Sequence, residues 1–121
     1  DGTYYKALDE FRASYSRKQQ LVCEKLDAMA DLGVSYERPR GGVYIWCRLP
    51  DGVDSKRFIN RAYNMGLILI PGYVFYPFKN GGRDRVRINY SYESEERLLR
   101  GMDVFRAALE EERTEQLAHE K

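Results

Sequence analysis

The strongest constraint on the fold is a long apolar stripe with helical spacing at the start of the chain. Its members recur at intervals of three, four and seven residues, and they are Tyr4, Leu8, Phe11, Tyr15, Val22, Leu26 and Met29. Gln19 occupies the one gap in the stripe, and Gly33 follows it as a candidate C-cap. This period is typical of a helix that buries one face. We therefore expect a helix from about Thr3 to about Leu32, a length that favours contact with protein outside its own domain.

A second helical stripe lies near the end of the chain. Glu95 and Glu96 stand at its expected N-terminus, where negative charge is favourable. The apolar members of this stripe follow at helical spacing, and they are Leu98, Met102, Phe105 and Leu109. The tail after Glu110 is highly charged, so we expect it to fray.

Short segments with the pattern of β-strands lie between the two long helices. Strands are predicted at 34–37, 43–49, 67–70 and 85–90, and Pro71 is expected to stop the third of them. A shorter helix is predicted between the second and third strands, capped by Asp54 or Ser55 and ended by Gly66. Its expected apolar face consists of Phe58, Ile59, Ala62 and Tyr63.

Two of these strands alternate between apolar and polar or amphipathic side chains. In the second strand, the face away from the core is expected to carry Tyr44, Trp46 and Arg48. In the fourth strand, the corresponding face is expected to carry Arg85, Arg87 and Asn89. Because Tyr44 and Trp46 are large and amphipathic, their face is suited to a partner surface rather than to open water.

The order helix, strand, strand, helix, strand, strand, helix predicts the fold class. We expect a single α+β domain over residues 1–121, in which a small antiparallel-type sheet is covered by helices. No internal repeat, linker or low-complexity segment interrupts it.

Composition excludes several classes of function. The formal net charge is +1 over 121 residues, so no global field favours nucleic acid or a membrane surface. Cys23 and Cys47 fit no metal motif, and we expect both to be reduced and buried. A single histidine, His119, makes histidine-based catalysis and His/Cys metal sites unfavoured. No apolar run approaches the length needed to cross a bilayer, and no secretory signal is visible, which predicts a cytoplasmic location.

Three pieces of sequence occur in a fixed order. They are R-G-G-V-Y-I-W-C-R-L-P at 40–50, G-L-I-L-I-P-G-Y-V-F-Y at 66–76 and R-V-R-I-N-Y at 85–90. Together they resemble the C-terminal small domain of class I/II aminotransferases, which are fold-type-I pyridoxal-phosphate enzymes. The Gly-Gly-x-aromatic-x-Trp strand that ends in Leu-Pro is most similar to the MocR branch. In that branch an aminotransferase-like domain follows a winged-helix DNA-binding domain of the GntR type.

The resemblance implies a concrete chemistry and a set of site residues. Pyridoxal 5'-phosphate would be held as a Schiff base by a lysine of a large domain, with its protonated ring acting as the electron sink. The small domain would close over that site and supply an arginine for the substrate carboxylate, and this arginine matches Arg87. Gly41 and Gly42 match a segment where a backbone without side chains lets the substrate come close. Tyr44 and Phe75 match positions that line the pocket.

One position departs from the family pattern. Tyr73 follows Pro71 and Gly72, where relatives often carry a small residue. This difference bears on the size of the substrate and on whether the parent protein is active.

Each of these residues also has a plain structural interpretation. From pattern alone, Arg87 is a solvated arginine on an exposed sheet face. The flanking motif favours the role in carboxylate binding, since a guanidinium binds a carboxylate through two parallel hydrogen bonds. For Gly41 and Gly42, a hairpin-entry turn is the alternative. For Tyr44 and Phe75, ordinary packing is the alternative.

The chain itself lacks the parts that would hold the cofactor. None of its lysines stands in the Ser/Thr-rich strand-end context of the family's cofactor lysine; they are Lys6, Lys18, Lys25, Lys56, Lys79 and Lys121. No aspartate suits the pyridine nitrogen, and no Gly-rich helix start suits a phosphate. We therefore expect that the chain alone neither binds the cofactor nor transaminates.

These observations predict that the chain is a fragment of a larger protein. Its expected partners are the large pyridoxal-phosphate domain of the same parent chain and an amino acid or 2-oxo acid substrate, in a homodimer. The parent is either an aminotransferase or a MocR-type regulator, which would bind DNA only through a separate winged-helix domain. No membrane contact is expected.

Two other functions compete with this interpretation. A free-standing α/β ligand-binding or dimerisation module would explain the size of the chain and the amphipathic face of Tyr44 and Trp46. It does not explain why three motif pieces match in order. An RNA-binding sheet would use Tyr44, Trp46 and Arg48 to stack bases, but the near-zero net charge disfavours it.

Overall fold

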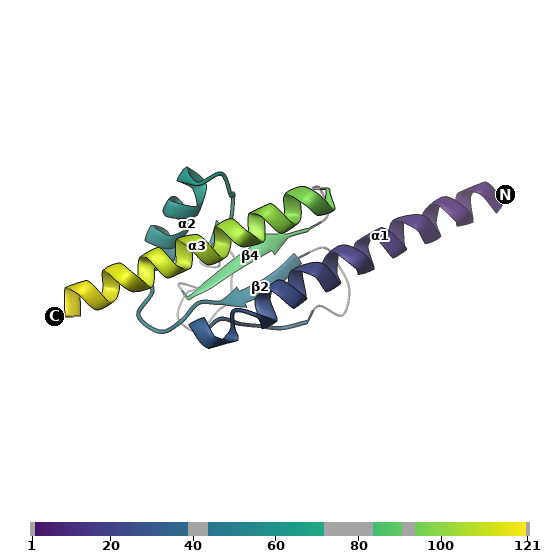
Figure 1. The fold of residues 1–121 in the computed structure, drawn as a ribbon. Coiled ribbons are helices and arrows are strands. Elements are labelled where there is room, and N and C mark those ends of the chain that lie inside the picture. Colours follow the sequence, from purple (N-terminus) through teal and green to yellow (C-terminus); the bar gives the residue numbers. More distant parts are fainter. Residues whose placement is uncertain (1, 39–43, 72–83, 91–93, 121) are drawn as a thin grey trace.

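A computed structural model of the chain describes residues 2–38, 44–71, 84–90 and 94–120 (Figure 1). The elements, in chain order, are α1 (Gly2–Asp27), the 3-10 turn η1 (Ala30–Leu32), β1 (Ser35–Tyr36), β2 (Tyr44–Arg48), α2 (Ser55–Asn64), β3 (Ile70–Pro71), β4 (Arg85–Asn89) and α3 (Glu95–Glu120). This order confirms the predicted succession of helices and strands.

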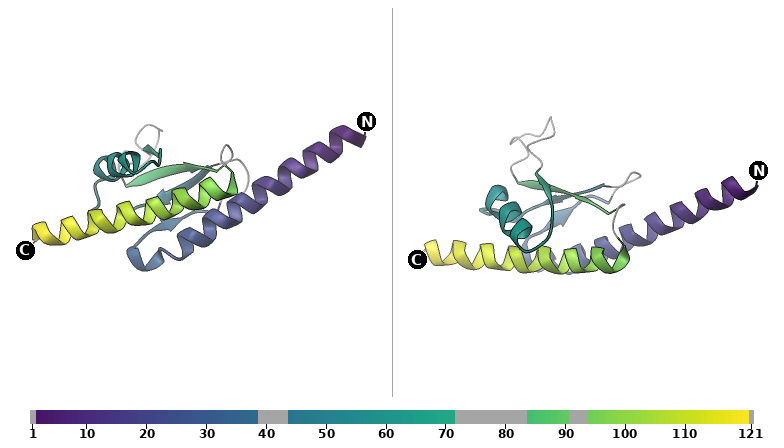
Figure 2. Two further views of the ribbon diagram at one scale, coloured as in Figure 1. Left: turned by 45° about the horizontal axis from the view of Figure 1, so that its top comes forward. Right: turned by 90° about the horizontal axis from the view of Figure 1, so that it is seen from above.

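The strands form one antiparallel sheet, and the long helices cover one of its faces. The strand order is β1-β2-β4-β3, and every neighbouring pair is antiparallel. Helices α1 and α3 lie side by side against one face, while α2 packs against α3 and β3 (Figures 1 and 2). The predicted α+β class, with a small antiparallel sheet covered by helices, is confirmed. No helix in the described parts of the chain is long and apolar enough to cross a lipid bilayer.

The C-terminal half of α1 is anchored to the sheet, and its N-terminal part extends beyond it (Figure 2). Val22, Leu26 and Met29 are almost fully buried, as the stripe predicts. Gln19, in the gap of the stripe, donates a hydrogen bond from Nε2 to the hydroxyl of Tyr90 at 3.1 Å. The polar residue in the apolar stripe therefore has a hydrogen-bonding partner, so it is compatible with burial of this face.

Helix α1 ends at Asp27, earlier than the sequence indicates. Two turn residues and η1 complete the predicted length, and the backbone N–H of Gly33 then donates to the carbonyl of Ala30 at 3.0 Å. Gly33 has a φ of 90°, the left-handed conformation that ends helices at low cost only for glycine. Gly33 is thus a cap, as predicted, but of the 3-10 turn rather than of α1.

The core lies between the sheet and the helices. The predicted stripe of α3 is confirmed, since Leu98, Met102, Phe105 and Leu109 are each at most 5% exposed. The ring of Phe105 meets that of Phe58 from α2 edge-on, with 4.9 Å between centroids. The two cysteines are free thiols, and both are buried in this core, as predicted; they are Cys23 of α1 and Cys47 of β2.

The charged end of α3 is held in place, so the prediction that it frays after Glu110 is wrong. The helix continues to Glu120. The guanidinium of Arg61 in α2 contacts three carboxylates of this segment, with N–O distances of 2.8 Å to Glu111, 2.9 Å to Glu112 and 2.7 Å to Glu115. These contacts raise the pKa of Arg61, with the hydrogen bond to Glu115 as the largest cause. Residues far apart in the sequence thus stabilise a segment that is polar by itself.

The structure confirms the predicted cap of helix α2 and most of its predicted buried face. The side chain of Asp54 caps it, accepting from the backbone N–H of Lys56 at 2.9 Å. Phe58 and Ala62 are buried, but Tyr63 is 62% exposed, so its predicted place on the buried face is wrong. Tyr63 is five residues after Phe58, which turns it about 140° away around a helix.

The third strand differs from its predicted bounds. The sequence predicts a strand at 67–70 that Pro71 stops, whereas β3 consists of Ile70 and Pro71. The backbone N–H of Leu67 donates to the carbonyl of Ala62 at 2.9 Å, so Leu67 is bonded to the last turn of α2 rather than to a neighbouring strand. Pro71 pairs with Val86 on the edge of the sheet, where the missing N–H of proline is tolerated.

Candidate functional site

The sheet face opposite α1 and α3 is the candidate site, and it is called the open face below (Figure 2). Alternation along the strands separates it from the core, since Ile45 and Cys47 of β2 and Val86 of β4 are fully buried. The intervening side chains form the open face, as predicted, and they are Tyr44, Trp46, Arg48, Arg85, Arg87 and Asn89. Among the described helices, none packs on this face (Figure 2). It therefore brings aromatic and cationic groups together on an accessible surface.

Arg87 lies at the centre of the open face. Its neighbours across the sheet are Trp46 of β2 on one side and Ile70 of β3 on the other. Its Cζ atom lies over the ring of Tyr44, at 3.9 Å from the ring centroid. This distance is well within the range of a cation–π interaction. The guanidinium is therefore in close contact with the Tyr44 ring.

The cations at the other end of the open face are neutralised by a carboxylate. Asp84 Oδ2 lies 3.1 Å from Arg48 Nε, and Asp84 Oδ1 lies 3.8 Å from Arg85 Nε. Arg48 also lies 3.7 Å from Asp51. The side chain of Arg85 is 34% exposed. This charge pattern distinguishes Arg48 and Arg85, which face Asp84, from Arg87, which lies over Tyr44.

Of the predicted site residues, Arg87 and Tyr44 are brought together by the sheet. Trp46, expected with Tyr44 to lie on a face suited to a partner surface, is half-buried and directly opposite Arg87. The predicted substrate-binding residues Gly41 and Gly42 lie outside the described residues, as do Tyr73 and the predicted pocket residue Phe75.

The described strands of the open face contain no lysine that could form a Schiff base with pyridoxal phosphate. Lys25, on α1, instead bonds to Asp103 of α3 at 3.3 Å, on the helical side of the molecule. Within the parts of the chain that the structure describes, no group of three acidic, histidine or cysteine side chains is placed to hold a metal ion.

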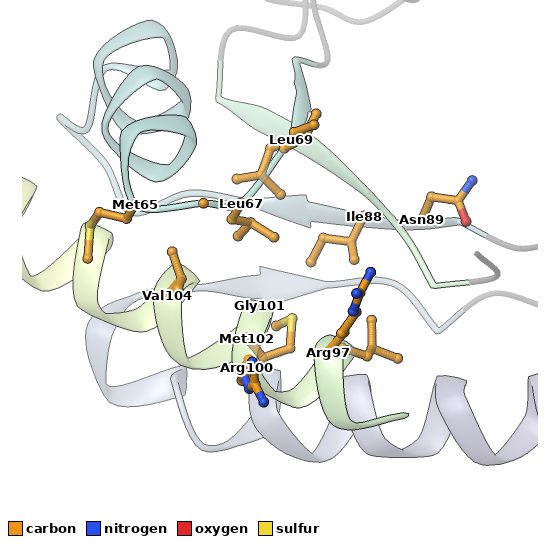
Figure 3. Close-up of a pocket in the computed structure, with 13 residues that line it drawn as sticks. Met65, Leu67, Leu69, Ile88, Asn89, Arg97, Arg100, Gly101, Met102 and Val104 are labelled. Carbon is orange, nitrogen blue, oxygen red and sulfur yellow. The ribbon is translucent and has the colours of Figure 1, made fainter. Parts of the chain in front are cut away.

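An apolar groove of about 480 Å³, which the sequence did not indicate, lies between the end of α2, β4 and α3. Figure 3 shows Leu67, from the segment after α2, Ile88 of β4 and Met102 of α3 pointing into it. At its mouth, Ile68 is 78% exposed. Because its lining comes from three separate segments, no single sequence motif could have revealed the groove. Arg87 is not part of it.

Curated relatives of the chain are aminotransferases. It is 26% identical over 98 residues to aromatic-amino-acid aminotransferase 1 of Thermococcus litoralis and 28% identical over 99 residues to 2-aminoadipate transaminase of Thermus thermophilus. These matches cover 81% and 82% of this chain but 23% and 25% of the relatives. The chain thus spans about a quarter of the length of the curated relatives it matches. No family model matches it.

A regulator also appears among the relatives. The chain is 21% identical over 101 residues to the uncharacterised HTH-type transcriptional regulator YdfD of Bacillus subtilis, of which it covers 20%.

Solved structures of aminotransferases share the fold of this chain. The α-aminoadipate aminotransferase LysN of Thermus thermophilus, in complex with N-(5'-phosphopyridoxyl)-L-leucine, has a TM-score of 0.80 and 28% identity over 92% of this chain and 28% of its own. The kynurenine aminotransferase of Pyrococcus horikoshii has a TM-score of 0.77 and 32% identity, over 92% of this chain and 27% of its own. Over most of its length, the chain therefore has homologues and structural neighbours that are pyridoxal-phosphate aminotransferases.

Proposed function

We propose that residues 1–121 are the small domain of a pyridoxal-phosphate-dependent aminotransferase, and that Arg87 binds the carboxylate of the amino acid or 2-oxo acid substrate. One observation carries the proposal. Arg87 lies at the centre of the open face, over Tyr44, in a fold shared with LysN, whose solved complex contains a phosphopyridoxyl amino acid.

The geometry of Arg87 suits a carboxylate. A guanidinium presents its N–H donors in a plane and pairs with both carboxylate oxygens at once, which the ammonium of lysine cannot do. Strands on both sides fix the backbone of Arg87, since Trp46 and Ile70 are its partners in the sheet. The half-buried side chains around it limit hydration, which strengthens an ion pair with an incoming carboxylate.

The cofactor would be held by other parts of the parent protein. When bound, pyridoxal phosphate supplies the electron sink for amino-group transfer. The role proposed for this chain is to bind and orient the substrate beside it. The apolar groove and the exposed Ile68 support the small-domain assignment, because exposed apolar surface of this kind is typical of contacts with further protein. The homodimer and the cytoplasmic location stay predictions.

Substitution of Arg87 in the full-length protein tests the proposal. We expect Arg87→Gln to raise the KM for amino acid and 2-oxo acid about 30- to 1,000-fold, the equivalent of about 2–4 kcal/mol, because the carboxylate loses its charged partner. Arg87→Lys should keep the charge but lose the paired hydrogen bonds, with a smaller increase. Arg85→Lys, two residues away on the same face, is the matched control and should change KM less than about threefold. A wild-type KM in Arg87→Gln would reject the proposal.

A regulator is the second candidate, and the similarity to YdfD is the observation that favours it. In that case, Arg87 would bind the carboxylate of an effector rather than of a substrate to be converted. The two candidates differ in turnover: an aminotransferase converts amino acid and 2-oxo acid catalytically, whereas a regulator changes its affinity for DNA when the amino acid binds. Turnover without any DNA binding by the full-length protein would exclude the regulator.

A further inference from the structure

We infer that Tyr44 is a positioning residue that holds the Arg87 guanidinium for the substrate carboxylate. This inference rests on the proposed function, and it adds a residue that selects for carboxylates without touching them. The observation that carries it is the contact between the two side chains, in which Cζ of Arg87 lies over the Tyr44 ring at 3.9 Å from its centroid.

The register of the sheet explains how this contact arises. Tyr44 pairs with Asn89, and Trp46 pairs with Arg87, so Tyr44 and Arg87 are diagonal neighbours on the same face. Diagonal neighbours on adjacent strands lie within reach of aromatic and long side chains. Tyr44 is 39% exposed, so its ring is accessible from the open face and is not simply part of the core. The ring therefore contributes to the site rather than to packing beneath the sheet.

The Tyr44 ring does not itself accept hydrogen bonds in the plane of the guanidinium. When a guanidinium meets a ring through its flat side, its N–H donors point outward in its own plane, away from the ring. A carboxylate can therefore accept two hydrogen bonds in that plane while the ring remains in contact. Arginine otherwise loses considerable rotamer freedom when it becomes ordered. By holding the side chain before the ligand arrives, Tyr44 would reduce this cost and raise the affinity for carboxylates.

The contrast with the neighbouring arginines supports this role. Arg48 and Arg85 face the carboxylate of Asp84, which already occupies the position that a substrate carboxylate would take. Tyr44 orients Arg87 without offering it a competing negative charge. The neutral ring of Tyr44 thus adds no negative charge beside Arg87, whereas an acidic side chain at residue 44 would add one.

The test compares a carboxylate with its neutral amide. The probes are 4-methylpentanoate, which lacks an amino group and is not transaminated, and 4-methylpentanamide, and their dissociation constants are measured by calorimetry on the full-length protein loaded with pyridoxal phosphate. The ratio of the two constants isolates recognition of the carboxylate. Tyr44→Leu should lower the preference for the carboxylate over the amide about 3- to 30-fold, which corresponds to the strength of a cation–π contact. Tyr44→Phe keeps the ring and should stay within about twofold of the wild type.

Two further variants distinguish loss of the contact between Tyr44 and Arg87 from general damage to the fold. Tyr63→Leu, which removes an exposed tyrosine from α2, is the control and should leave the preference unchanged. In an Arg87→Gln background, Tyr44→Leu should have no additional effect, whereas damage to the fold would lower the affinity for both probes equally. A normal preference in Tyr44→Leu, together with a lost preference in Arg87→Gln, would overturn the role of Tyr44 alone. A normal preference in Arg87→Gln would overturn the proposed function as well.

Discussion

The contact between Arg61 and the end of α3 gives a stability prediction that can be worked out from the structure. We expect Arg61→Met to lower the free energy of unfolding by about 2–3 kcal/mol. Glu112 is only 6% exposed, and removal of Arg61 leaves its carboxylate with Arg57 Nε at 3.7 Å. Loss of one partner from a fully buried ion pair costs about 3–5 kcal/mol, and exposed pairs are worth about 0.2–1 kcal/mol. The Arg61 side chain is 23% exposed, so the effect should lie between these limits.

Urea denaturation of the chain measures this loss. For a small domain, the free energy of unfolding falls by about 1–3 kcal/mol per molar urea, so a loss of about 2–3 kcal/mol should lower the midpoint by about 0.7–3 M. The control is Arg100→Met, which removes an i,i+4 pair with Glu96 whose side chains are 73% and 77% exposed. This control should lose at most about 0.5 kcal/mol. If both partners are replaced, in Arg61→Met with Glu112→Leu, most of the stability should return, because no buried charge is left alone.

The reasoning would be refuted if Arg61→Met lost no more stability than Arg100→Met. In that case, the contacts of Arg61 with the carboxylates would contribute little, and apolar packing alone would hold the end of α3.

Two further predictions concern the backbone and the buried thiols. Gly66→Ala should lower the free energy of unfolding by about 1 kcal/mol, because φ is 101° and the added Cβ would meet nothing within 4 Å. Gly33→Ala should lower it more, because the added Cβ would also lie 3.0 Å from Cβ of Pro50. Urea denaturation compares the two variants, and an equal loss of stability would contradict this expectation. Burial raises the pKa of the Cys47 and Cys23 thiols, so unfolding releases protons above about pH 8.5 and the free energy of unfolding should fall as pH rises beyond that value. Cys47→Ala should reduce this slope between about pH 8.5 and 10, and an unchanged slope would show that Cys47 does not contribute.

Features that depend on local periodicity could be predicted from the sequence. The buried stripe of α3, with Phe105 at its centre, follows from the 3.6-residue turn of a helix. The two faces of β4, with Val86 buried and Arg87 on the open face, follow from the two-residue period of a strand. These periods constrain each segment by itself, so the element order and the fold class could be predicted without tertiary information.

Features that depend on contacts between distant segments could not be predicted. The end of α3 was expected to fray because its own composition is polar, but Arg61 binds Glu112 across 51 positions of the chain. The contact between Tyr44 and Arg87 depends on the register of β2 against β4, which the alternation of either strand leaves open. The sequence did identify both residues as site candidates, through the resemblance rather than through their packing.

The most direct test of the account is to locate the cofactor in the protein expressed from its complete gene. The protein is treated with pyridoxal phosphate, reduced with borohydride, digested, and examined by mass spectrometry for a pyridoxyl-lysine peptide. The account predicts a single modified lysine outside residues 1–121, because no described strand of the open face carries a lysine. Modification of a lysine within these residues, or no modification at all, would contradict the proposal that this chain is the small domain beside a separate cofactor domain.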